Sequence, residues 1–586
     1  MTMLSRRPHV CFAQLAFALL AAIGAQASPL VVTNTNDSGA GSLRQAITAS
    51  PAGGSIEFNI PTTDPGYAPL TGTFYITLSG GELAIGRDLT ITGPTNAKLE
   101  ISVNGFARAF NIVAGSVSIS NLTIAKGSVA GVDGADGGNQ TPAVAGGSGE
   151  GGGILNNGTL TLSNCTVSGN SCSGGRGGSG NSAPGSTFRS GAAGGEGIGA
   201  GISNNGTLTM RNCTVTGNTA VGGPGGAGTG SAAGAGGSAR GSGVASSGAL
   251  TMTNCTINGN SASGANGANN SGSAAPGAGG SATGGGVAPS GASTALLQNT
   301  IIAGNSVSAG TAGVNPNVPP APNGVASGPD VGGTVMSQGH NLIGRTDGSN
   351  GWSASDLLGG TTAGTRLDPL LGPLQDNGGI AYTRRPLPGS AAIDSGDDAV
   401  TSAPANLLTD ERNYPRKIGT HVDIGAVETG IVQAGPTFTV SNADNHNDGT
   451  CSTDDCTLLE ALNASNASSD ANTINFAPIV LGAIAPELFT TAGLSITNPV
   501  TINGPGARIL AIDGKNQSRG FNIAAGATVT ISGLTLKNCN SGSGVSGGAI
   551  QNAGTLTLSN CSVLNNSGGS GGGVATFGTL TVNNCT

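Results

Sequence analysis

The chain repeats one short pattern of apolar and polar positions. In residues 151–171, GGGILNNGTLTLSNCTVSGNS, brief apolar or alternating runs are separated by Gly, Asn and Ser. The central TLTL alternates with period two, as a half-buried strand does, and no part of the unit has apolar residues at helical spacing. Because so short a unit cannot bury its inner face alone, the copies must stack as a solenoid. Further copies begin at residues 199, 241, 284, 547 and 571.

The most closely spaced copies set the length of one coil. Cys539, Cys561 and Cys585 recur after Asn and are separated by 22 and 24 residues. A repeat of that length fits three short strands and three corners, which predicts an all-β, right-handed parallel β-helix. Stacking in register would then place the cysteines in one inward-pointing ladder beside a ladder of the preceding asparagines.

We interpret the cysteine ladder as a column of small buried side chains. The thiols recur once per coil rather than in close CxxC pairs, which argues against a metal or redox site. Cys172 lies outside this register. The predicted ladder comprises Cys165, Cys213, Cys255, Cys539, Cys561 and Cys585.

Glycine-rich insertions lengthen the early coils. Residues 174–196 and 221–240 consist mainly of Gly, Ala and Ser, with too few large apolar side chains to pack a core. We expect flexible loops that leave one corner of the coil, all on one side. A glycine-rich spiral packed as a second solenoid is the alternative.

The start of the pattern recurs late in the chain. FNIVAGSVSISNLTI (residues 110–124) returns as FNIAAGATVTISGLTL (521–536), an offset of 411 residues. This predicts a tandem duplication, with a cap and first coils in 28–127 and glycine-rich β-helix repeats in 128–340. A separate charged region follows in 341–430. A second copy of the N-terminal cap, with its own coils, then occupies 431–586. The last coil is incomplete, so we expect the sequence to be a fragment.

The first 27 residues have the pattern of a Sec signal peptide. Arg6 and Arg7 precede an apolar stretch at 15–23, and Ala25-Gln26-Ala27 is a small-x-small cleavage site. We expect cleavage after Ala27 and a secreted or cell-surface protein. No later apolar run is long enough for a transmembrane helix.

Composition excludes one class of partner. The chain has 106 glycines, only 9% charged residues and a formal net charge of −8. Without a basic patch or interleaved basic and aromatic residues, it is not expected to bind nucleic acid.

DGTCSTDDCTLLEALNAS (residues 448–465) resembles the CSLREA motif of secreted bacterial repeat proteins, with Thr457 and Leu459 replacing Ser and Arg. SLRQAI (42–47) is a cysteine-free version, and its Ser42 is placed to cap a short helix. Cys451 and Cys456 would suit a disulfide outside the cell. His446 alone provides too few ligands for a zinc site.

A second stretch resembles the choice-of-anchor Q domain. Its motifs are LDPLLGPLQDNGG from Leu367, LPGSAAIDSGD from Leu387, TDERNYPR from Thr409 and VDIGAVE from Val422. That resemblance implies a β-helix protein that reaches the cell surface, and it supplies no catalytic residues. The repeats also resemble those of pectate-lyase-like and polymorphic outer-membrane proteins.

The coils themselves lack acid–base chemistry. Residues 151–306 contain no Asp, Lys or His, and Glu196 is their only acid. A polysaccharide lyase or hydrolase needs clustered carboxylates or a carboxylate with a base, so these coils cannot carry such a site. We assign no catalytic residue and no cofactor.

Charged residues gather instead between 347 and 428. Loop aspartates beside glycine can bind calcium outside cells, but no EF-hand spacing occurs, so we favour turn capping. His340 and His421 stand alone, without a nucleophile nearby. The weak calcium candidates are Asp394, Asp397 and Asp398, beside Asp376, Asp410 and Asp423; Arg384, Arg385, Arg412 and Arg416 are expected to pair with these acids.

The leading hypothesis is an adhesin-like, secreted or surface-displayed protein with a structural or binding role. Its lateral face of stacked Asn, Ser and Thr would contact extracellular polysaccharide or a neighbouring cell surface. Enzymatic activity is the less favoured interpretation. The alternatives are a pectate-lyase-like carbohydrate-active enzyme with its site in 347–428 or beyond Thr586, and an autotransporter passenger domain.

Overall fold

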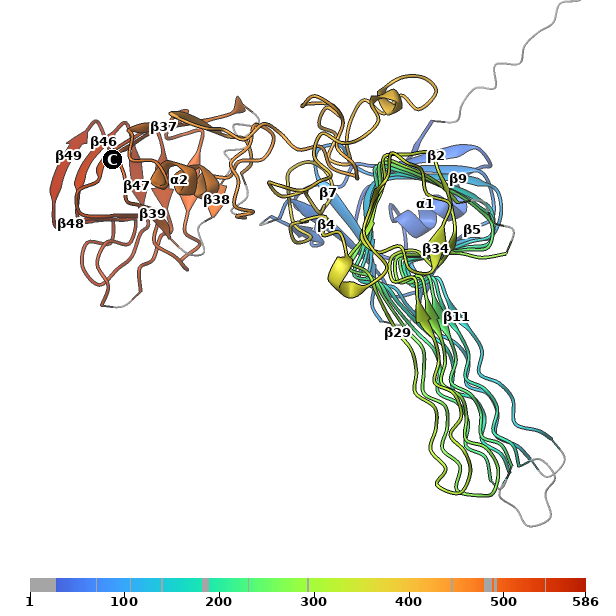
Figure 1. Ribbon diagram of the computed structural model, residues 1–586. Helices are drawn as coiled ribbons and strands as arrows, with labels where there is room; N and C mark the ends of the chain where they lie inside the picture. Colours follow the sequence, from blue (N-terminus) through green and yellow to red (C-terminus); the bar gives the residue numbers. More distant parts are fainter. Residues whose placement is uncertain are drawn as a thin grey trace, which may run out of the picture.

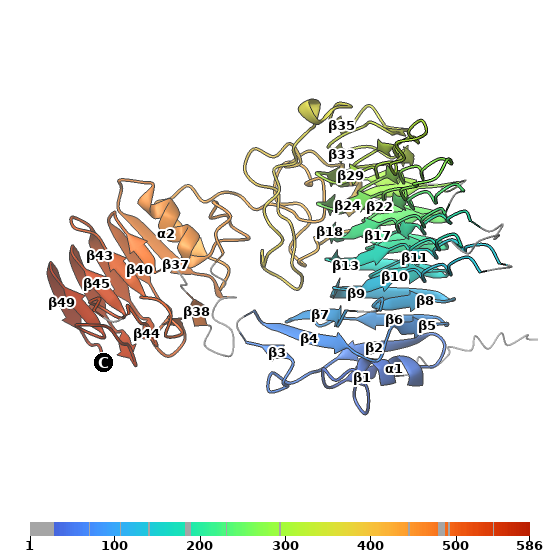
Figure 2. The same cartoon turned by 90° about the horizontal axis from the view of Figure 1, so that it is seen from below.

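A computed structural model describes residues 28–586 except 70, 106, 139–140, 182–188, 230, 292, 294, 444–445, 479–486, 490–492 and 543. The predicted signal peptide therefore lies outside the described residues. Nearly all strand pairs are parallel and in register, with coil stacked on coil, so the chain folds as a parallel β-helix (Figures 1 and 2). It contains two such solenoids with separate hydrophobic cores.

The longest sheet of the first solenoid has 17 strands. It runs the length of the stack in Figure 2, from the first helix to the last coils. Its main strands are β1 (Leu30–Val32), β2 (Gly54–Phe58), β4 (Thr73–Leu78), β6 (Leu89–Thr92), β7 (Lys98–Val103), β9 (Ser116–Ala125), β13 (Thr159–Ser168), β17 (Thr207–Arg211), β18 (Thr214–Thr216), β22 (Ala249–Thr253), β23 (Thr256–Asn258), β27 (Ala295–Gln298), β28 (Ile301–Ala303), β33 (Leu342–Ile343) and β35 (Leu357–Leu358).

A six-stranded sheet closes the second side of these coils. It consists of β5 (Leu83–Ile85), β8 (Phe110–Ile112), β12 (Ile154–Asn156), β16 (Ile202–Asn204), β21 (Val244–Ser246) and β26 (Val287–Pro289).

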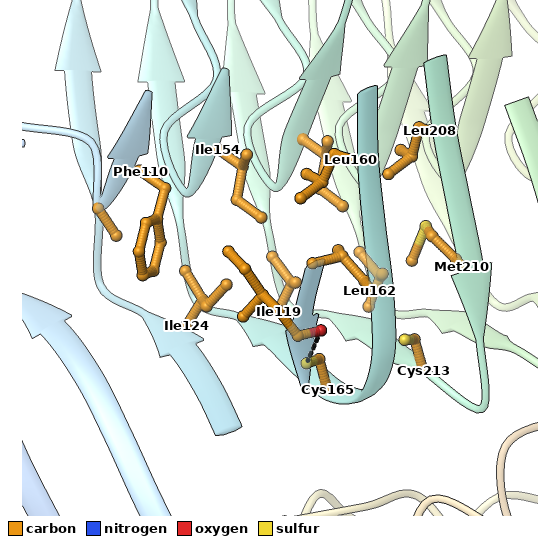
Figure 3. Packing of buried hydrophobic residues seen from close by; sticks show 14 of the residues in the cluster. Phe110, Ile119, Ile124, Ile154, Leu160, Leu162, Cys165, Leu208, Met210 and Cys213 are labelled. Carbon is orange, nitrogen blue, oxygen red and sulfur yellow. Dashed lines mark hydrogen bonds between the residues drawn. The ribbon is translucent and has the colours of Figure 1, made fainter. Parts of the chain in front are cut away.

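The alternating TLTL pattern fills the core between the sheets. Leu160 and Leu162 are fully buried and stand in register with Leu208 and Met210 of the next coil. Cys165 points into the same interior, and Figure 3 shows Cys213 beside it one coil further on. Burial raises the pKa of the Cys165 thiol to about 12, so it behaves as a small apolar side chain.

Asparagine forms the corner that precedes each cysteine. Asn164, Asn212 and Asn254 have φ of 52°, 49° and 51°, a left-handed conformation that Asn tolerates better than most residues. The amide of Asn212 donates to Oδ1 of Asn164 at 3.2 Å, so these corners also bond along the stack.

A second asparagine ladder is buried deeper. The side-chain amides of Asn170, Asn218, Asn260 and Asn305 each donate to the next coil, and each carbonyl oxygen also accepts a backbone N–H. Asp330 ends the column, where its Oδ1 accepts both the backbone and the amide N–H of Asn305. Such a column satisfies polar groups that water cannot reach.

The glycine-rich insertions form a packed arm, which corrects the expectation of flexible loops. They do leave one corner, all on one side, and Figure 1 shows them running out together as the green segments. The arm leaves through β10 (Ser128–Ala130), β14 (Ser171–Ser173), β19 (Thr219–Val221), β24 (Ser261–Ser263) and β29 (Ser306–Ser308). It returns through β11 (Gly149–Glu150), β15 (Gly197–Ile198), β20 (Ala239–Arg240), β25 (Ala282–Thr283) and β30 (Ala326–Ser327).

Backbone hydrogen bonds between layers hold this arm together. The N–H groups of Gly131, Gly134 and Gly137 donate to the carbonyls of Ser173, Arg176 and Ser179, each at 2.8 Å. The period of three residues is that of polyproline-II chains, which have no internal hydrogen bonds and must bond to neighbours. The packed arm corresponds to the alternative of a second, glycine-rich solenoid, which the shortage of large apolar side chains had made the less favoured of the two.

Glycine is required inside the arm because the backbones lie too close for side chains. A Cβ on Gly175 would overlap the carbonyl of Val132, and one on Gly195 would overlap the carbonyl of Gly147. Cys172, which lies outside the main ladder, packs with buried alanines such as Ala200 at the base of the arm.

The second solenoid repeats the architecture of the first on a smaller scale. Its sheets comprise β36 (Thr437–Val440), β37 (Asn472–Phe476), β40 (Val500–Asn503), β43 (Thr528–Ser532), β46 (Thr555–Ser559) and β49 (Thr579–Asn583); β38 (Glu487–Phe489), β41 (Ala511–Asp513), β44 (Thr535–Lys537) and β47 (Ser562–Leu564); and β39 (Leu494–Ile496), β42 (Phe521–Ile523), β45 (Ile550–Asn552) and β48 (Val574–Thr576). In this unit Cys539 and Cys561 are buried, and Cys585 is partly exposed. Cys561 and Cys585 stand in one ladder, but Cys539 does not, contrary to the prediction. Thr528 pairs with Thr555, an offset of 27 residues rather than 22, so Cys539 lies opposite Asn566, whose Oδ1 accepts its N–H at 2.8 Å.

Each solenoid starts with a strand followed by a short capped helix. In α1 (Leu43–Ala49), the Ser42 hydroxyl accepts the N–H of Gln45. In α2 (Leu458–Asn466), Thr457 and Glu460 form a reciprocal capping box. Both helices place buried leucines or alanines against the adjoining core.

Residues 359–430 form no long strand and pack along the side of the first solenoid. The Thr166 hydroxyl donates to the carbonyl of Tyr382 at 2.7 Å, and the Asn212 amide donates to the carbonyl of Thr409 at 2.8 Å. The fully buried Glu411 accepts hydrogen bonds from Thr166 and Thr214. The charged region is thus held by polar groups at the cysteine-side corner of the coils.

The arm generates a stability prediction. Gly195→Ala should destabilise the protein by about 1–3 kcal/mol, since the layers must separate to admit a methyl group. Ala193→Ser, at an exposed position two residues away, should leave stability unchanged. Urea unfolding with limited proteolysis of the arm measures both. Equal stability of Gly195→Ala and the wild type would contradict the packed arm.

The buried end of the asparagine ladder generates a pH prediction. Burial raises the pKa of Asp330 from 3.8 to about 6. Between pH 4 and 6 the folded state therefore binds more protons than the unfolded state, and stability falls as pH rises. Asp330→Asn should reduce this loss of unfolding free energy by an amount on the order of 2 kcal/mol. Asp470→Asn, at an exposed site, should not, as urea unfolding at several pH values can show.

Candidate functional site

A groove lies where residues 366–371 face the side of the first solenoid. It encloses about 170 Å³ and is lined by Asn258 and Gly304 of the coils, by 366–369 and Leu371, and by Arg384. Asn258 ends β23 and Gly304 directly follows β28, so consecutive coils form the floor. The charged region supplies the opposite wall.

Arg384 is the half-buried cation of this groove, and it does not pair with an acid as the sequence argument expected. Its Nε donates to the Thr216 hydroxyl at 3.0 Å and its Nη1 to the carbonyl of Gly372 at 3.2 Å. These bonds orient the guanidinium, and no carboxylate of a described residue lies within ion-pair distance of it. Burial lowers the pKa of Arg384, yet a guanidinium remains charged at neutral pH.

A second arginine and one acid complete the polar lining. Arg366 is exposed and forms no ion pair with a described residue. Asp368 is exposed, and its Oδ1 accepts the N–H of Leu370, which caps the local turn. The groove therefore combines two arginines with an amide, which suits an anionic polar ligand.

Hydroxyl columns lie on the outer face of the same solenoid, along β13, β17 and β22. Thr161, Thr209 and Thr251 stand in register and are partly exposed. Next to them, Ser163, Arg211 and Thr253 form a parallel column in which Arg211 is exposed. The stacked Ser and Thr that the sequence predicted do form regular columns, and periodic hydroxyls can hydrogen-bond to an extended polar chain.

The other arginines of the charged region are structural. Arg412 is fully buried, 2.8 Å from Asp410 and 2.9 Å from Asp454. Arg385 is equally buried and lies 2.8 Å from Asp448. Two partners of these arginines, Asp448 and Asp454, thus lie outside the charged region, so the ion pairs join the second solenoid to residues 359–430.

Arg416 makes its contacts within the charged region. It donates to the carbonyl of Gly425 at 2.6 Å, and its charge favours the ionised forms of Asp423 and Glu428. Burial nevertheless raises the pKa of Glu428 to about 8, and the nearby charge of Asp423 adds to that shift.

The three calcium candidates already accept hydrogen bonds from the chain. Asp394 Oδ1 accepts the N–H of His421, and Asp397 Oδ1 accepts the N–H of Ala399 as a helix cap. Asp398 pairs with Lys417 at 2.5 Å. Each carboxylate thus orders a turn, and among the described residues these three do not bring ligand atoms together as a group.

The remaining sequence candidates lie at dispersed positions. Cys451 and Cys456 form a disulfide with Cα atoms 4.3 Å apart. Asp376 pairs with Lys98 at 2.5 Å. His340 contacts the carbonyl of Ser395 at 3.0 Å.

Sequence reasoning missed the groove and one buried cluster. Arg366 and Arg384 are 18 positions apart, and no sequence motif links them to Asn258. His446, Asp448 and Glu460 bring one ligand atom each to within 4.8 Å of one another. The HxD spacing of the first two was visible, but the contribution of Glu460 depends on the helix folding back.

Comparisons with known proteins leave the family of the chain open. No family model matches it, and no curated protein matches it. Among solved structures, a PL6 family alginate lyase, AlyGC, is similar at 11% identity with a TM-score of 0.16. That alignment covers 94% of this chain and 80% of the lyase chain, but its score is too low to support an argument about the site. No helix among the described residues is long and apolar enough to span a membrane.

The buried ion pairs generate a prediction about the junction. Arg412→Met should destabilise the second solenoid by about 3–5 kcal/mol, because it leaves Asp410 and Asp454 buried without their cation. Arg345→Met, which breaks the partly exposed pair with Asp347, should cost less than about 1 kcal/mol. Urea unfolding compares the two variants, and similar losses would contradict a structural role for Arg412.

Proposed function

We propose that this chain is a secreted or cell-surface β-helix protein that binds acidic polysaccharide along the side of its first solenoid. The observation that carries the proposal is the groove of about 170 Å³ in which Arg384 is oriented by Thr216 and Gly372 but has no acidic partner among the described residues. An oriented guanidinium binds carboxylate or sulfate groups through paired N–H donors.

The shape of the surroundings supports a polymeric ligand. The groove opens on a solenoid whose coils present the same residue types at each step, so a chain of sugar units can make repeated contacts. The Thr and Ser columns provide hydroxyl donors and acceptors on the outer face of the same solenoid. The resemblance to CSLREA and choice-of-anchor Q sequences supports export and a place at the cell surface.

Binding is favoured over turnover because the groove holds a single acid. Asp368 is committed to a turn, and the coils beneath contribute Asn258 and Gly304, which do not titrate. General acid–base cleavage of a glycosidic bond requires two groups with different pKa values on the same ligand. The groove therefore fits an adhesive or structural role.

A direct binding assay tests the proposal. Calorimetric titration of the full chain with oligogalacturonate should show binding that weakens with salt, whereas a neutral glucan oligomer should not bind. Arg384→Gln should reduce affinity about tenfold or more through loss of charge-assisted hydrogen bonds.

Two further variants make the assay specific. Arg366→Gln removes an exposed cation from the same groove without a buried bond, so lower affinity there cannot be ascribed to misfolding. Arg508→Gln, at an exposed position of the second solenoid, is the matched control and should bind normally. Unchanged affinity in both groove variants, or equal binding of the neutral oligomer, would refute the proposal; depolymerisation of the ligand would favour an enzyme.

A further inference from the structure

The junction between residues 359–430 and the second solenoid buries an excess of negative charge. Two arginines, Arg385 and Arg412, face five acids whose side chains are 5% exposed or less: Asp410, Asp448, Asp454, Asp455 and Glu460. Buried carboxylates are costly unless they are neutralised by cations or protons. Additional positive charge is therefore expected within the cluster.

The same cluster contains His446, whose side chain is 7% exposed. Its Nε2 lies 3.3 Å from Asp455 Oδ2 and 3.6 Å from Glu460 Oε1. His446, Asp448 and Glu460 each bring one ligand atom to within 4.8 Å of the others. An imidazole with carboxylates at this separation matches the ligand types and approximate span of a site for a transition-metal ion.

Asp455 provides an independent indication of a ligand. Its residue is fully buried, and its Oδ1 accepts the Asn442 amide at 3.0 Å. Its Oδ2 is buried and accepts no hydrogen bond of good geometry from a described residue; it lies 3.3 Å from His446 Nε2 and 3.7 Å from Arg385 Nη1. A buried carboxylate oxygen without a hydrogen bond is uncommon in native proteins, and a bound cation would satisfy it.

The loop that carries these groups is held in place on several sides. The Cys451–Cys456 disulfide closes the turn before α2. Glu460 Oε1 accepts the N–H of Asp448 at 2.8 Å, and Glu460 Oε2 accepts the N–H of Thr457 at 2.9 Å. Potential ligands that the fold already holds in place favour metal binding, because their side chains lose little conformational freedom when the ion binds.

The strand, turn and short helix at the beginning of the first solenoid provide an internal comparison with those of the second. There Arg44 of the SLRQA motif lies 2.7 Å from Asp37, so the acid of that turn is neutralised locally. In the second start Leu459 stands at the position of Arg44 in the motif, and the acids are more numerous. The second start therefore relies on Arg385 and Arg412 from the preceding region, together with His446, to offset its described acids.

We propose that His446, Asp448, Asp455 and Glu460 bind one divalent transition-metal ion, with zinc as the probe, which fastens the second solenoid to residues 359–430. The mixed imidazole and carboxylate set favours zinc over calcium, which prefers oxygen ligands alone. The alternative occupant of the same space is a proton, in which case His446 is an imidazolium paired with Asp455 and Glu460. The proposal is independent of polysaccharide binding.

Thermal unfolding of the full chain with and without metal decides between these two arrangements. After chelator treatment and dialysis, added Zn²⁺ should bind at one ion per chain by calorimetry. At 100-fold excess over Kd it should raise the Tm of the second solenoid by about 5 °C or more. Ca²⁺ at the same concentration should produce no shift. Absence of stoichiometric zinc binding would overturn the proposal and leave the imidazolium pair.

Variants assign any zinc effect to this cluster. His446→Gln and Asp455→Asn should each abolish the zinc-dependent shift, whatever their effect on Tm without metal. His421→Gln, at the exposed histidine beside Asp398, should retain the full shift. A shift that survives in His446→Gln, or disappears in His421→Gln, would place zinc elsewhere and refute the assignment.

Discussion

In-register stacking of parallel coils is the constraint on which the rest of this structure depends. Once coils stack, inward polar groups must find hydrogen-bond partners within the protein, since water is excluded, and the equivalent residue one coil away is the nearest candidate. The columns from Asn170 to Asn305 meet this need because an amide both donates and accepts, so a column can continue indefinitely. It ends where an acceptor-only side chain, Asp330, takes the last position. The same rule governs the corners at Asn164 and Asn212.

The arm obeys that constraint without a hydrophobic core. Its layers continue the spacing of the coils, and glycine allows backbones to approach closely enough to exchange hydrogen bonds. Stability there comes from many satisfied peptide groups rather than from buried apolar area. The result is an ordered surface extension on one side, while residues 359–430 occupy another side and form the groove around Arg384.

The charged residues divide into two functional classes because of burial. Arg412 and Arg385 are enclosed with acids and join two parts of the chain, so their charges are unavailable to a ligand. Arg384 is only partly enclosed and bonds to a hydroxyl and a carbonyl, and no acid in the described part of the chain pairs with it. Arg384 and Arg385 are adjacent in sequence, yet one lines the groove and the other is buried in ion pairs. The difference comes from the residues that the fold places around each side chain.

The local pattern of apolar and polar residues was enough to predict much of the fold of this protein. The stacking of coils, the inward cysteines other than Cys539, the corner asparagines and the capped helices follow from residues close together in sequence, because each coil contacts only the coils beside it. The tertiary structure alone decided the packing of the arm, since interlayer backbone bonds leave no apolar pattern to detect. It also decided the groove and the cluster at His446. Asn258 meets Arg384, and Arg385 meets Asp448, only because chain segments far apart in sequence fold against one another.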